Sequence, residues 1–375
     1  MKKFNLIIIM IDGGRLDRAE KSSTFEKLKT KSVFFSNSIT YGPHTIAAMH
    51  AVFSGCYGSR TGTNSYWSTY NFKKEKFKTI TEYLKENNFY TYADVINQLV
   101  IPKQGFDVHV IHDELNDNLT ERHSELIRSM KNITNENKNF FLYLHYSKIH
   151  TGIMKEVLKV YDNFSQEFFQ NKNQNEQRYD RLFKEAETYL QNILNEIYHQ
   201  ELDKDSVILI MSDHGVSVGE KIGERAYGAF CYDYTLKTFT YFLIPKINSI
   251  QIKQQIRTID IMPTILELME IELDSKYSKL DGKSLVPLMK NKFYEEQYAF
   301  SETGNPLKEK APPKEPNIKS IRTSEWKLIF NEFENSRELY NIQNDPHEEK
   351  NIIDTNNIIK IKLWNELLRI MNTNY

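Results

Sequence analysis

Acidic and imidazole side chains stand directly after two apolar runs of this sequence. Asp12 follows "NLIIIMI" and precedes two glycines, whereas Asp213 and His214 close the run "SVILIMSDHG". The glycines let the backbone bend sharply, which leaves the Asp12 carboxylate at the end of its run. Carboxylate oxygens and imidazole nitrogens suit divalent metals, so these residues are expected to share one ion. Turn formation by Asp12 and helix capping by Asp213 are the structural alternatives.

A hydroxyl that could act as a nucleophile occurs in "TYGPHTIAAMHAVFSG", residues 40–55. Thr45 precedes a run of small residues typical of a helix, so it could simply cap that helix. The same position suits catalysis, because the free N–H groups of a helix N-terminus attract an anion. A threonine hydroxyl needs a metal or a base to become a good nucleophile. Thr45 is therefore either a cap or the nucleophile of a metal-dependent enzyme.

Buried strands that alternate with helices are expected to position these residues. Continuous apolar runs predict strands covered on both faces, and periodic stretches predict the helices between them. Strands are expected at residues 4–11, 33–35, 89–95 and 140–144, in the run that ends at residue 213 and in "FTYFLIP"; helices are expected at residues 24–30, 45–53, 79–86 and about 154–199. The alternation indicates an α/β fold with a mostly parallel central sheet flanked by helices. Ligands bind at the carboxyl ends of such strands, so Asp12, the segment 145–150 and Asp213 should converge.

The sequence changes character after Pro287. Short strand-like pieces follow one another ("YAFSE", "IKSIRT", "WKLIF" and "ELYNI"), and a helix is expected at about residues 353–371. Consecutive short strands favour a small antiparallel sheet. We therefore predict a metal-binding catalytic α/β domain at residues 1–290 and a small C-terminal α+β subdomain at residues 291–375.

Composition argues against several classes of protein. The chain has 375 residues, 40% of them hydrophobic, and a formal net charge of -1, which argues against a nucleic-acid partner. Its two cysteines form neither a disulfide framework nor a zinc-ligand pattern. The N-terminal apolar run lacks a signal-peptide cleavage site, and no run reaches the roughly 20 apolar residues of a membrane span. We expect a cytoplasmic protein without a membrane span, whose oligomeric state the sequence leaves open.

Seven segments, in order along the chain, resemble the sulfatase-like branch of the alkaline phosphatase superfamily. They are "IIIMIDGGRLDR", "STFEKLKTKSVFFSNSIT", "GPHTIAAMHAVFSG", "FLYLHYSKIH", "LIMSDHGVSVGEK", "RTIDIMPTILELMEI" and the C-terminal pair "DGKSLVPLM" with "WKLIF…ELYNIQNDPHEEKNI". The resemblance covers nearly the whole chain. It implies an α/β fold with a central sheet and one bound divalent metal ion, with Mn, Zn or Ca as the candidates.

The nucleophile position departs from that of true sulfatases, which carry a Cys or Ser there for conversion to formylglycine. This chain has Thr45 at that position and lacks the arginine of the sulfatase motif. The resemblance is then to relatives that act on phosphorus, such as phosphonate monoester hydrolases, phosphodiesterases and phosphoethanolamine transferases. The family's second aspartate is Gly13 here. The metal ligands that the resemblance implies are therefore Asp12, Thr45, Asp213 and His214.

The resemblance also implies roles for five further polar residues. His150 is expected to be catalytic, as a hydrogen-bond donor to a phosphoryl oxygen or to the leaving group. His145 is expected to orient groups beside the substrate, and Asn64 to contact a non-bridging oxygen. Lys221 and Arg225 are rival contacts for the substrate anion, and the alternative for Lys221 is an exposed surface lysine.

These residues together predict a metal-dependent enzyme in which Thr45 attacks a phosphate ester, a phosphodiester or a phosphonate. A phospho-threonine intermediate would then pass its group to water or to an acceptor hydroxyl. The expected partner is a small-molecule or saccharide phosphate ester. Two alternatives stay open: a transferase that moves a phospho-substituent onto a saccharide or lipid head group, and a non-catalytic binding module that keeps the fold.

Overall fold

A nine-stranded sheet forms the centre of the computed structural model, which describes residues 3–160, 166–224, 226–304, 315–355 and 357–374. The strand order is β4-β3-β5-β1-β6-β7-β2-β8, and β9 pairs with β2. The strands are β1 (Asn5–Ile11), β2 (Val33–Ile39), β3 (Phe89–Val95), β4 (Val108–Ile111), β5 (Asn139–Tyr146), β6 (Ser206–Met211), β7 (Lys237–Leu243), β8 (Ile250–Ile252) and β9 (Ile256–Arg257). Neighbouring strands are parallel except β7, which runs antiparallel to β6 and β2. The predicted mostly parallel central sheet is confirmed.

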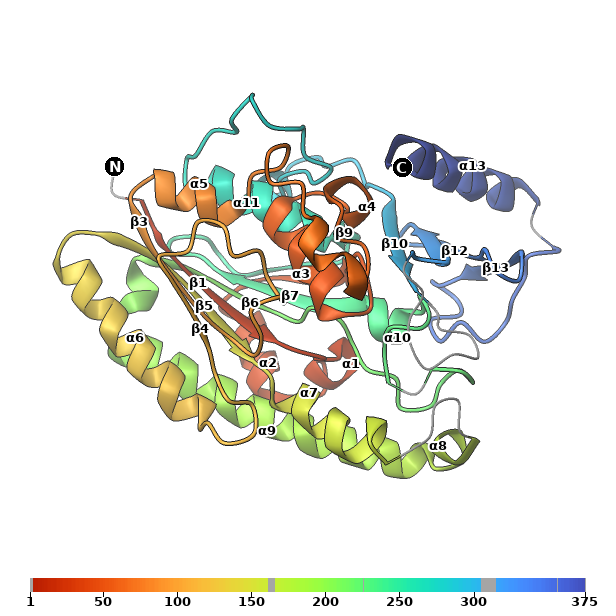
Figure 1. Ribbon diagram of the computed structural model, residues 1–375, viewed down its shortest axis with the longest axis horizontal. Coiled ribbons are helices and arrows are strands. Elements are labelled where there is room, and N and C mark those ends of the chain that lie inside the picture. Colours follow the sequence, from red (N-terminus) through yellow and green to blue (C-terminus); the bar gives the residue numbers. More distant parts are fainter. Residues whose placement is uncertain (1–2, 161–165, 225, 305–314, 356, 375) are drawn as a thin grey trace.

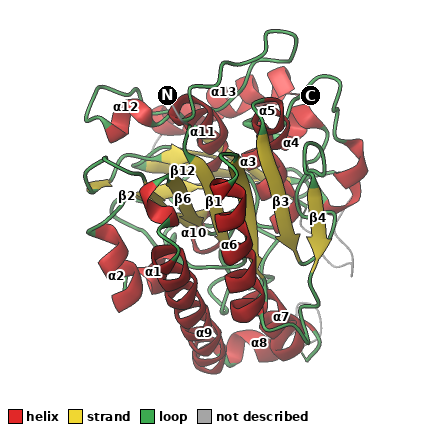
Figure 2. Cartoon of the chain, turned by 90° about the vertical axis from the view of Figure 1, so that its left-hand side faces the viewer, coloured by secondary structure: helices red, strands yellow, loops and turns green. Residues whose placement is uncertain are grey.

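Helices cover both faces of this sheet (Figure 1). On one face lie α6 (Leu119–Asn135) and α9 (Lys172–His199), which Figure 2 shows beside each other. On the other face lie α3 (Thr45–Ser54), α5 (Ile80–Glu86) and α11 (Ile261–Leu268). The remaining helical segments are α1 (Leu16–Ala19), α2 (Ser23–Lys29), α4 (Gly58–Thr61), η1 (Tyr66–Asn71), α7 (Lys148–Ile153), η2 (Met154–Leu158), α8 (Gln166–Gln170), η3 (Leu202–Lys204), α10 (Asp233–Leu236), η4 (Thr258–Asp260) and α12 (Val286–Met289). None of the described helices is both long and apolar enough to cross a membrane.

The central strand β1 explains how the sheet positions a site. All of its residues are buried, with Ile9 packed in the hydrophobic cluster of α6 and α9 and Ile8 in that of α3 and α5. Two covered faces require the uninterrupted apolar run seen in the sequence. Met10 pairs with His145 of β5 on one side and with Met211 of β6 on the other. The residues that follow β1 and β6 therefore lie at one edge of the sheet, beside the end of β5.

The helical region predicted at about residues 154–199 is not one continuous helix. The structure has α7, the π-helical segment η2 and α8 before the long helix α9 begins at Lys172. α7 and α9 approach each other closely, since a Cβ added at Gly152 would lie 2.3 Å from Leu182 Cδ2. Because α7 packs against the side of α9, the two helices do not share one axis.

A second, antiparallel sheet follows residue 290 and lies beside the main one (Figure 1). Its strands are β10 (Ala299–Thr303), β11 (Ile318–Arg322), β12 (Trp326–Asn331) and β13 (Ser336–Asn341), and the helix α13 (Asn357–Asn374) packs on it. The predicted antiparallel strands and terminal helix are confirmed. The division at residue 290 stays a prediction. Buried side chains join the two parts, since Tyr41 and Ala47 share a hydrophobic cluster with Phe300 and Leu328.

Candidate active site

The carboxyl ends of β1 and β6 bring Asp12, Asp213 and His214 together. One ligand atom from each residue lies within 4.8 Å of the others, and all three side chains are buried. The backbone N–H groups of Gly13 and His214 donate to Asp213 Oδ1 at 3.0 and 2.9 Å. Gly13 has a φ of 72°, a conformation that favours glycine. The turn after β1 therefore orients the second carboxylate as well as the first.

Two oxygens of these carboxylates, Asp12 Oδ1 and Asp213 Oδ2, face His214 Nε2, at 3.6 and 3.3 Å. Among the described residues, no hydrogen bond reaches the buried atoms Asp12 Oδ1 and Asp213 Oδ2. Burial and the nearby Asp12 raise the pKa of Asp213. Burial also opposes ionisation of Asp12, but His145 Nε2, 3.1 Å from Asp12 Oδ2, and the charges of neighbouring histidines outweigh it and lower the pKa of Asp12. Buried carboxylate oxygens of this kind are costly unless a cation pairs with them.

Thr45 is the first residue of α3 and faces this cluster. The residue that caps the helix is His44, whose Nδ1 accepts the backbone N–H of Ala47 at 3.4 Å. Burial, with a contribution from His214, lowers the pKa of His44 to about 3, which keeps its imidazole neutral. Thr45 Oγ1 lies 3.4 Å from Asp12 Oδ2 and 3.3 Å from His214 Nε2. The capping role considered for Thr45 thus belongs to His44, and the threonine hydroxyl points to the carboxylates.

His150 lies on α7, and the ring of Tyr227 neighbours both His150 and His214 of the cluster. Its ring centroid is 6.3 Å from that of Tyr227, which in turn is 4.8 Å from that of His214. His150 Nδ1 is 3.4 Å from Glu114 Oε2, the distance of an ion pair rather than of a well-aligned hydrogen bond. Burial opposes its protonation, but Glu114 and then Asp12 outweigh burial, so the pKa of His150 is raised. This position suits a cationic donor, and the predicted role of His150 stays a prediction.

Asn64 follows α4 and is buried in a local network. Its backbone N–H donates to Ser68 Oγ at 3.0 Å, and Ser68 Oγ donates to Asn64 Oδ1 at 3.2 Å. Asn64 Nδ2 donates to Glu315 Oε2 at 3.4 Å. These contacts hold the amide in one orientation, but they include none of the four predicted metal ligands, and its contact with a substrate oxygen stays a prediction.

Lys221 and Arg225 are the two cations predicted to contact the substrate anion. Lys221 donates to the backbone carbonyl of Glu348, and its Nζ lies 4.8 Å from the Tyr232 ring centroid and 5.6 Å from that of Tyr340. Lys221 is therefore tied to the C-terminal part of the chain rather than freely exposed. Arg225 lies outside the described residues.

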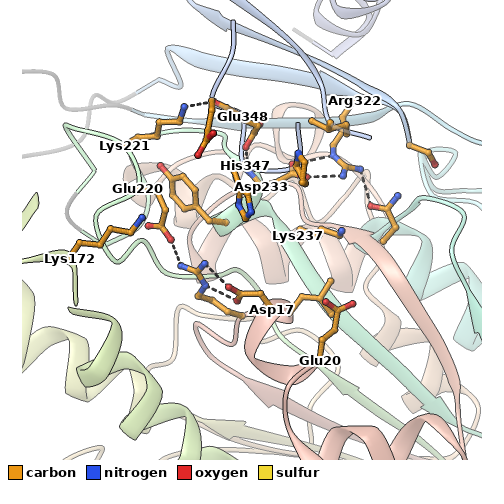
Figure 3. Close-up of a pocket in the computed structure, with 18 residues that line it drawn as sticks. Asp17, Glu20, Lys172, Glu220, Lys221, Asp233, Lys237, Arg322, His347 and Glu348 are labelled. Atoms are coloured by element: carbon orange, nitrogen blue, oxygen red, sulfur yellow. Dashed lines mark hydrogen bonds and ion pairs between the residues drawn. The ribbon is translucent and has the colours of Figure 1, made fainter. Parts of the chain in front are cut away.

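Lys221 lines a cavity of about 520 Å³ between the main sheet and the C-terminal sheet (Figure 3). Ion pairs close much of its wall: Arg15 Nη1 lies 2.6 Å from Glu220 Oε1, and Arg322 Nη2 lies 2.8 Å from Asp233 Oδ2. The side chains of the predicted metal ligands are not part of its lining. The cavity is thus distinct from the Asp12 cluster.

A second buried group, which the sequence interpretation did not single out, lies near the first. Asp94, His112 and His123 each place one ligand atom within 4.8 Å of the others. Here the aspartate already has partners, because His112 Nδ1 is 2.7 Å from Asp94 Oδ1 and Arg122 Nε donates to Asp94 Oδ2. Asp94 is the last residue but one of β3, inside the strand expected at residues 89–95, so a rule that looks only after the ends of strands passes over it. His112 follows β4, a strand of four residues that the sequence pattern does not mark.

Comparison with known protein families gives two overlapping matches along the chain. The family described as Sulfatase matches residues 5–271, and the family described as N-sulphoglucosamine sulphohydrolase, C-terminal, matches residues 228–373. A curated relative, a sulfatase from Formosa agariphila, is 27% identical over 161 residues, which are 42% of this chain and 28% of that protein. The match therefore spans less than a third of the relative's length.

Solved structures share the fold over almost the full length. A phosphonate monoester hydrolase from Agrobacterium radiobacter has a TM-score of 0.77 at 12% identity, covering 100% of this chain and 96% of that chain. A protein in complex with its substrate D-glucosamine-2-N,6-O-disulfate has a TM-score of 0.73 at 15% identity, covering 99% of this chain and 97% of that chain. At these identities the likeness concerns the fold.

Proposed function

The chain belongs to the sulfatase family, and on this basis we propose that it is a metal-dependent hydrolase of phosphorus esters with Thr45 as its nucleophile. The observation that carries the proposal is the place of Thr45 Oγ1, 3.4 Å from Asp12 Oδ2 and 3.3 Å from His214 Nε2. Thr45 also stands where a sulfatase needs the Cys or Ser that becomes formylglycine. A phosphate ester, phosphodiester or phosphonate is therefore a better substrate than a sulfate ester.

The donor set fits one divalent metal ion. Asp12, Asp213, His214 and the Thr45 hydroxyl would hold it. Two buried carboxylate oxygens that accept no hydrogen bond from the described residues support this assignment. Mixed oxygen and nitrogen donors are compatible with Mn or Zn, and the oxygens also with Ca. When bound, the ion supplies positive charge that lowers the pKa of the Thr45 hydroxyl and neutralises the oxygens of the substrate.

The proposed reaction gives one role to Thr45 and another to His150. Thr45 Oγ1 loses its proton to solvent and forms a bond to phosphorus, while the bond from phosphorus to the leaving oxygen breaks. His150 donates a proton to that oxygen, and Asn64 contacts a non-bridging oxygen. A water molecule, which gives a proton back to His150, then attacks phosphorus, the bond from phosphorus to Thr45 Oγ1 breaks, and Thr45 Oγ1 regains a proton from solvent. The N-terminus of α3 favours the negative charge of the transferred group throughout.

The alternatives share these residues and differ in the acceptor or in activity. A transferase would pass the phospho-threonine group to a hydroxyl of a saccharide or lipid head group instead of water. A non-catalytic binding module would have no need for a hydroxyl directed at two buried carboxylates. The hydrolase is preferred because water, unlike a saccharide or lipid head group, needs no acceptor site beyond the residues already described.

The test is a panel of 4-nitrophenyl esters that differ only in the acid: phosphate, methyl phosphate, phenylphosphonate and sulfate. Each is assayed with Mn, Zn and Ca, and the products are analysed with and without an added alcohol. We expect turnover of at least one phosphorus ester with a matching metal, and little turnover of the sulfate. Comparable rates on the sulfate would contradict the proposed substrate class. An alcohol-derived phosphoester as the main product would favour the transferase.

A further inference from the structure

The segment His112 to Glu114, after β4, meets the start of α7 at three successive points. His112 Nε2 lies 2.8 Å from Ser147 Oγ. Lys148 Nζ donates to the backbone carbonyl of Glu114 at 2.7 Å. Glu114 Oε2 lies 3.4 Å from His150 Nδ1. These residues, which we name the 112–114 brace, therefore contact the short stretch that carries His150.

The brace is anchored in the interior of the sheet edge. The backbone N–H of His112 donates to the carbonyl of Val95 at 2.9 Å, which extends the pairing of β3 and β4. Asp94 Oδ1, 2.7 Å away, can only accept, so His112 Nδ1 carries a hydrogen. In the neutral ring His112 Nε2 then accepts the hydroxyl hydrogen of Ser147. Asp94, His112 and Ser147 are buried, and a satisfied network in such surroundings resists rotation of its members.

The anchored serine determines where α7 begins. The Ser147 carbonyl accepts the N–H of Thr151 at 3.0 Å, which closes the turn that contains His150. Glu114 Oε2 lies at ion-pair distance from His150 Nδ1, 3.4 Å away, so Nε2 is the nitrogen left to donate to a bound group. The ring of His150 neighbours Tyr227, the residue that also contacts His214. Movement of the brace would therefore change both the place and the orientation of this donor.

We propose that Glu114 and His112 are positioning residues for His150, Glu114 through its carboxylate and His112 through Ser147 at the start of α7. This inference rests on the proposed role of His150 as the proton donor to the leaving oxygen. The nearby Asp94 is bonded by both His112 and the cation Arg122, an arrangement that disfavours a metal ion there. The brace thus acts on the reaction without touching the substrate.

The leaving group provides the readout that distinguishes positioning from general loss of structure. Wild type, Glu114→Gln, His112→Asn and His150→Gln are assayed on 4-nitrophenyl, phenyl and ethyl esters of the same phosphonate. A nitrophenolate leaves without a proton, whereas ethoxide requires one. The rates are compared as kcat/KM, which reports the departure of the leaving group and not the later attack of water. In this quantity His150→Gln should lose about 10²–10⁴-fold on the ethyl ester and little on the nitrophenyl ester. Glu114→Gln and His112→Asn should show the same graded pattern at about tenfold.

A matched control and a second measurement keep the proposal separable from the proposed function. Glu125→Gln removes an exposed carboxylate on α6 and should leave all three rates unchanged. Crystal structures of both metal-loaded proteins should show the His150 ring in a single orientation in wild type and displaced from it in Glu114→Gln. If wild type hydrolyses no ester, the proposed function fails. The two crystal structures still show whether Glu114 positions the His150 ring.

Three results would overturn the brace. The first is an equal loss on all three esters in Glu114→Gln, which indicates a purely structural effect. The second is an unmoved His150 ring in the variant structure. The third is a second equivalent of bound metal that disappears in His112→Asn, because the Asp94 group would then be a metal site.

Discussion

Thr45 begins α3 without capping it, so its hydroxyl can be removed without removing the cap. His44 accepts the N–H of Ala47 and remains in Thr45→Ala. We therefore expect this variant to stay folded and to lose turnover of phosphorus esters by about 10⁴-fold or more, the scale found when a nucleophile is removed. Thr45→Ser keeps a hydroxyl and should retain measurable activity. Steady-state rates and thermal unfolding of both variants provide the measurement.

The control for Thr45 lies at the other end of the same helix. Ser54 Oγ donates to the His50 carbonyl at 2.8 Å and does not face the cluster. Ser54→Ala should therefore keep its turnover while it loses a helix hydroxyl of similar size. Near wild-type turnover in Thr45→Ala, free of contaminating phosphatase, would return this threonine to a structural role.

The two buried carboxylates of the cluster lead to a separate prediction about metal content. Asp12→Asn and Asp213→Asn each replace a charged donor by a neutral one, so both should lose bound metal and activity while remaining folded. Elemental analysis after gel filtration, together with circular dichroism, measures the two effects. Asp180→Asn, an exposed aspartate on α9, is the control and should keep its metal. Full metal stoichiometry in either variant would remove that residue from the ligand set.

At the scale of elements, the sequence predicted the strands that a local apolar run marks. β1, β5 and β6 follow from apolar runs, and the strand-end rule then brings Asp12 and Asp213 together as the structure does. The direction of β7 could not be predicted, because an apolar run looks the same in either direction. The link from His112 to Ser147 could not be predicted either, since it joins residues 35 apart through the short strand β4.

The loop between β6 and α10 carries a carboxyl group whose ionisation should affect stability. Burial raises the pKa of Glu224 to about 7, although Tyr234 and the N–H groups of Ala229 and Phe230 donate to it. A folded pKa above the ordinary 4.5 means that the contribution to stability is complete below about pH 4.5. That contribution is lost as the pH rises through about 7.

The thermal stability of Glu224→Gln minus that of wild type should therefore be larger at pH 8 than at pH 5. The glutamine oxygen can still accept the backbone N–H groups, and its amide can donate to the Tyr234 hydroxyl oxygen. Thermal unfolding of both proteins at the two pH values measures the effect. Glu125→Gln, which is exposed, should differ from wild type by the same amount at both. A difference for Glu224→Gln that does not change with pH would contradict the role given to its burial.

At the scale of the whole molecule, one buried carboxylate joins the two sheets. Asp233, at the start of α10, accepts from Arg322 of β11 at 2.8 Å and from Lys327 of β12 at 2.8 Å. Lys327 also pairs with Glu348 at 2.7 Å. Burial opposes ionisation of Asp233, but the two cations outweigh it and lower its pKa. The C-terminal sheet is thus held to the main one by charge as well as by apolar packing.

Removal of that charge should destabilise the entire chain. Asp233→Asn leaves Arg322 buried without its carboxylate and Lys327 with Glu348 alone, and breaking a buried pair in this way costs about 3–5 kcal/mol. Asp180→Asn removes an exposed partner of Arg18 and should cost at most about 1 kcal/mol. Urea unfolding followed by fluorescence and by circular dichroism measures both. Equal midpoints for the two variants would show that Asp233 does not join the sheets energetically. A wild-type transition that splits in two only in Asp233→Asn would show that this carboxylate couples two units able to unfold separately, as the division at residue 290 predicts.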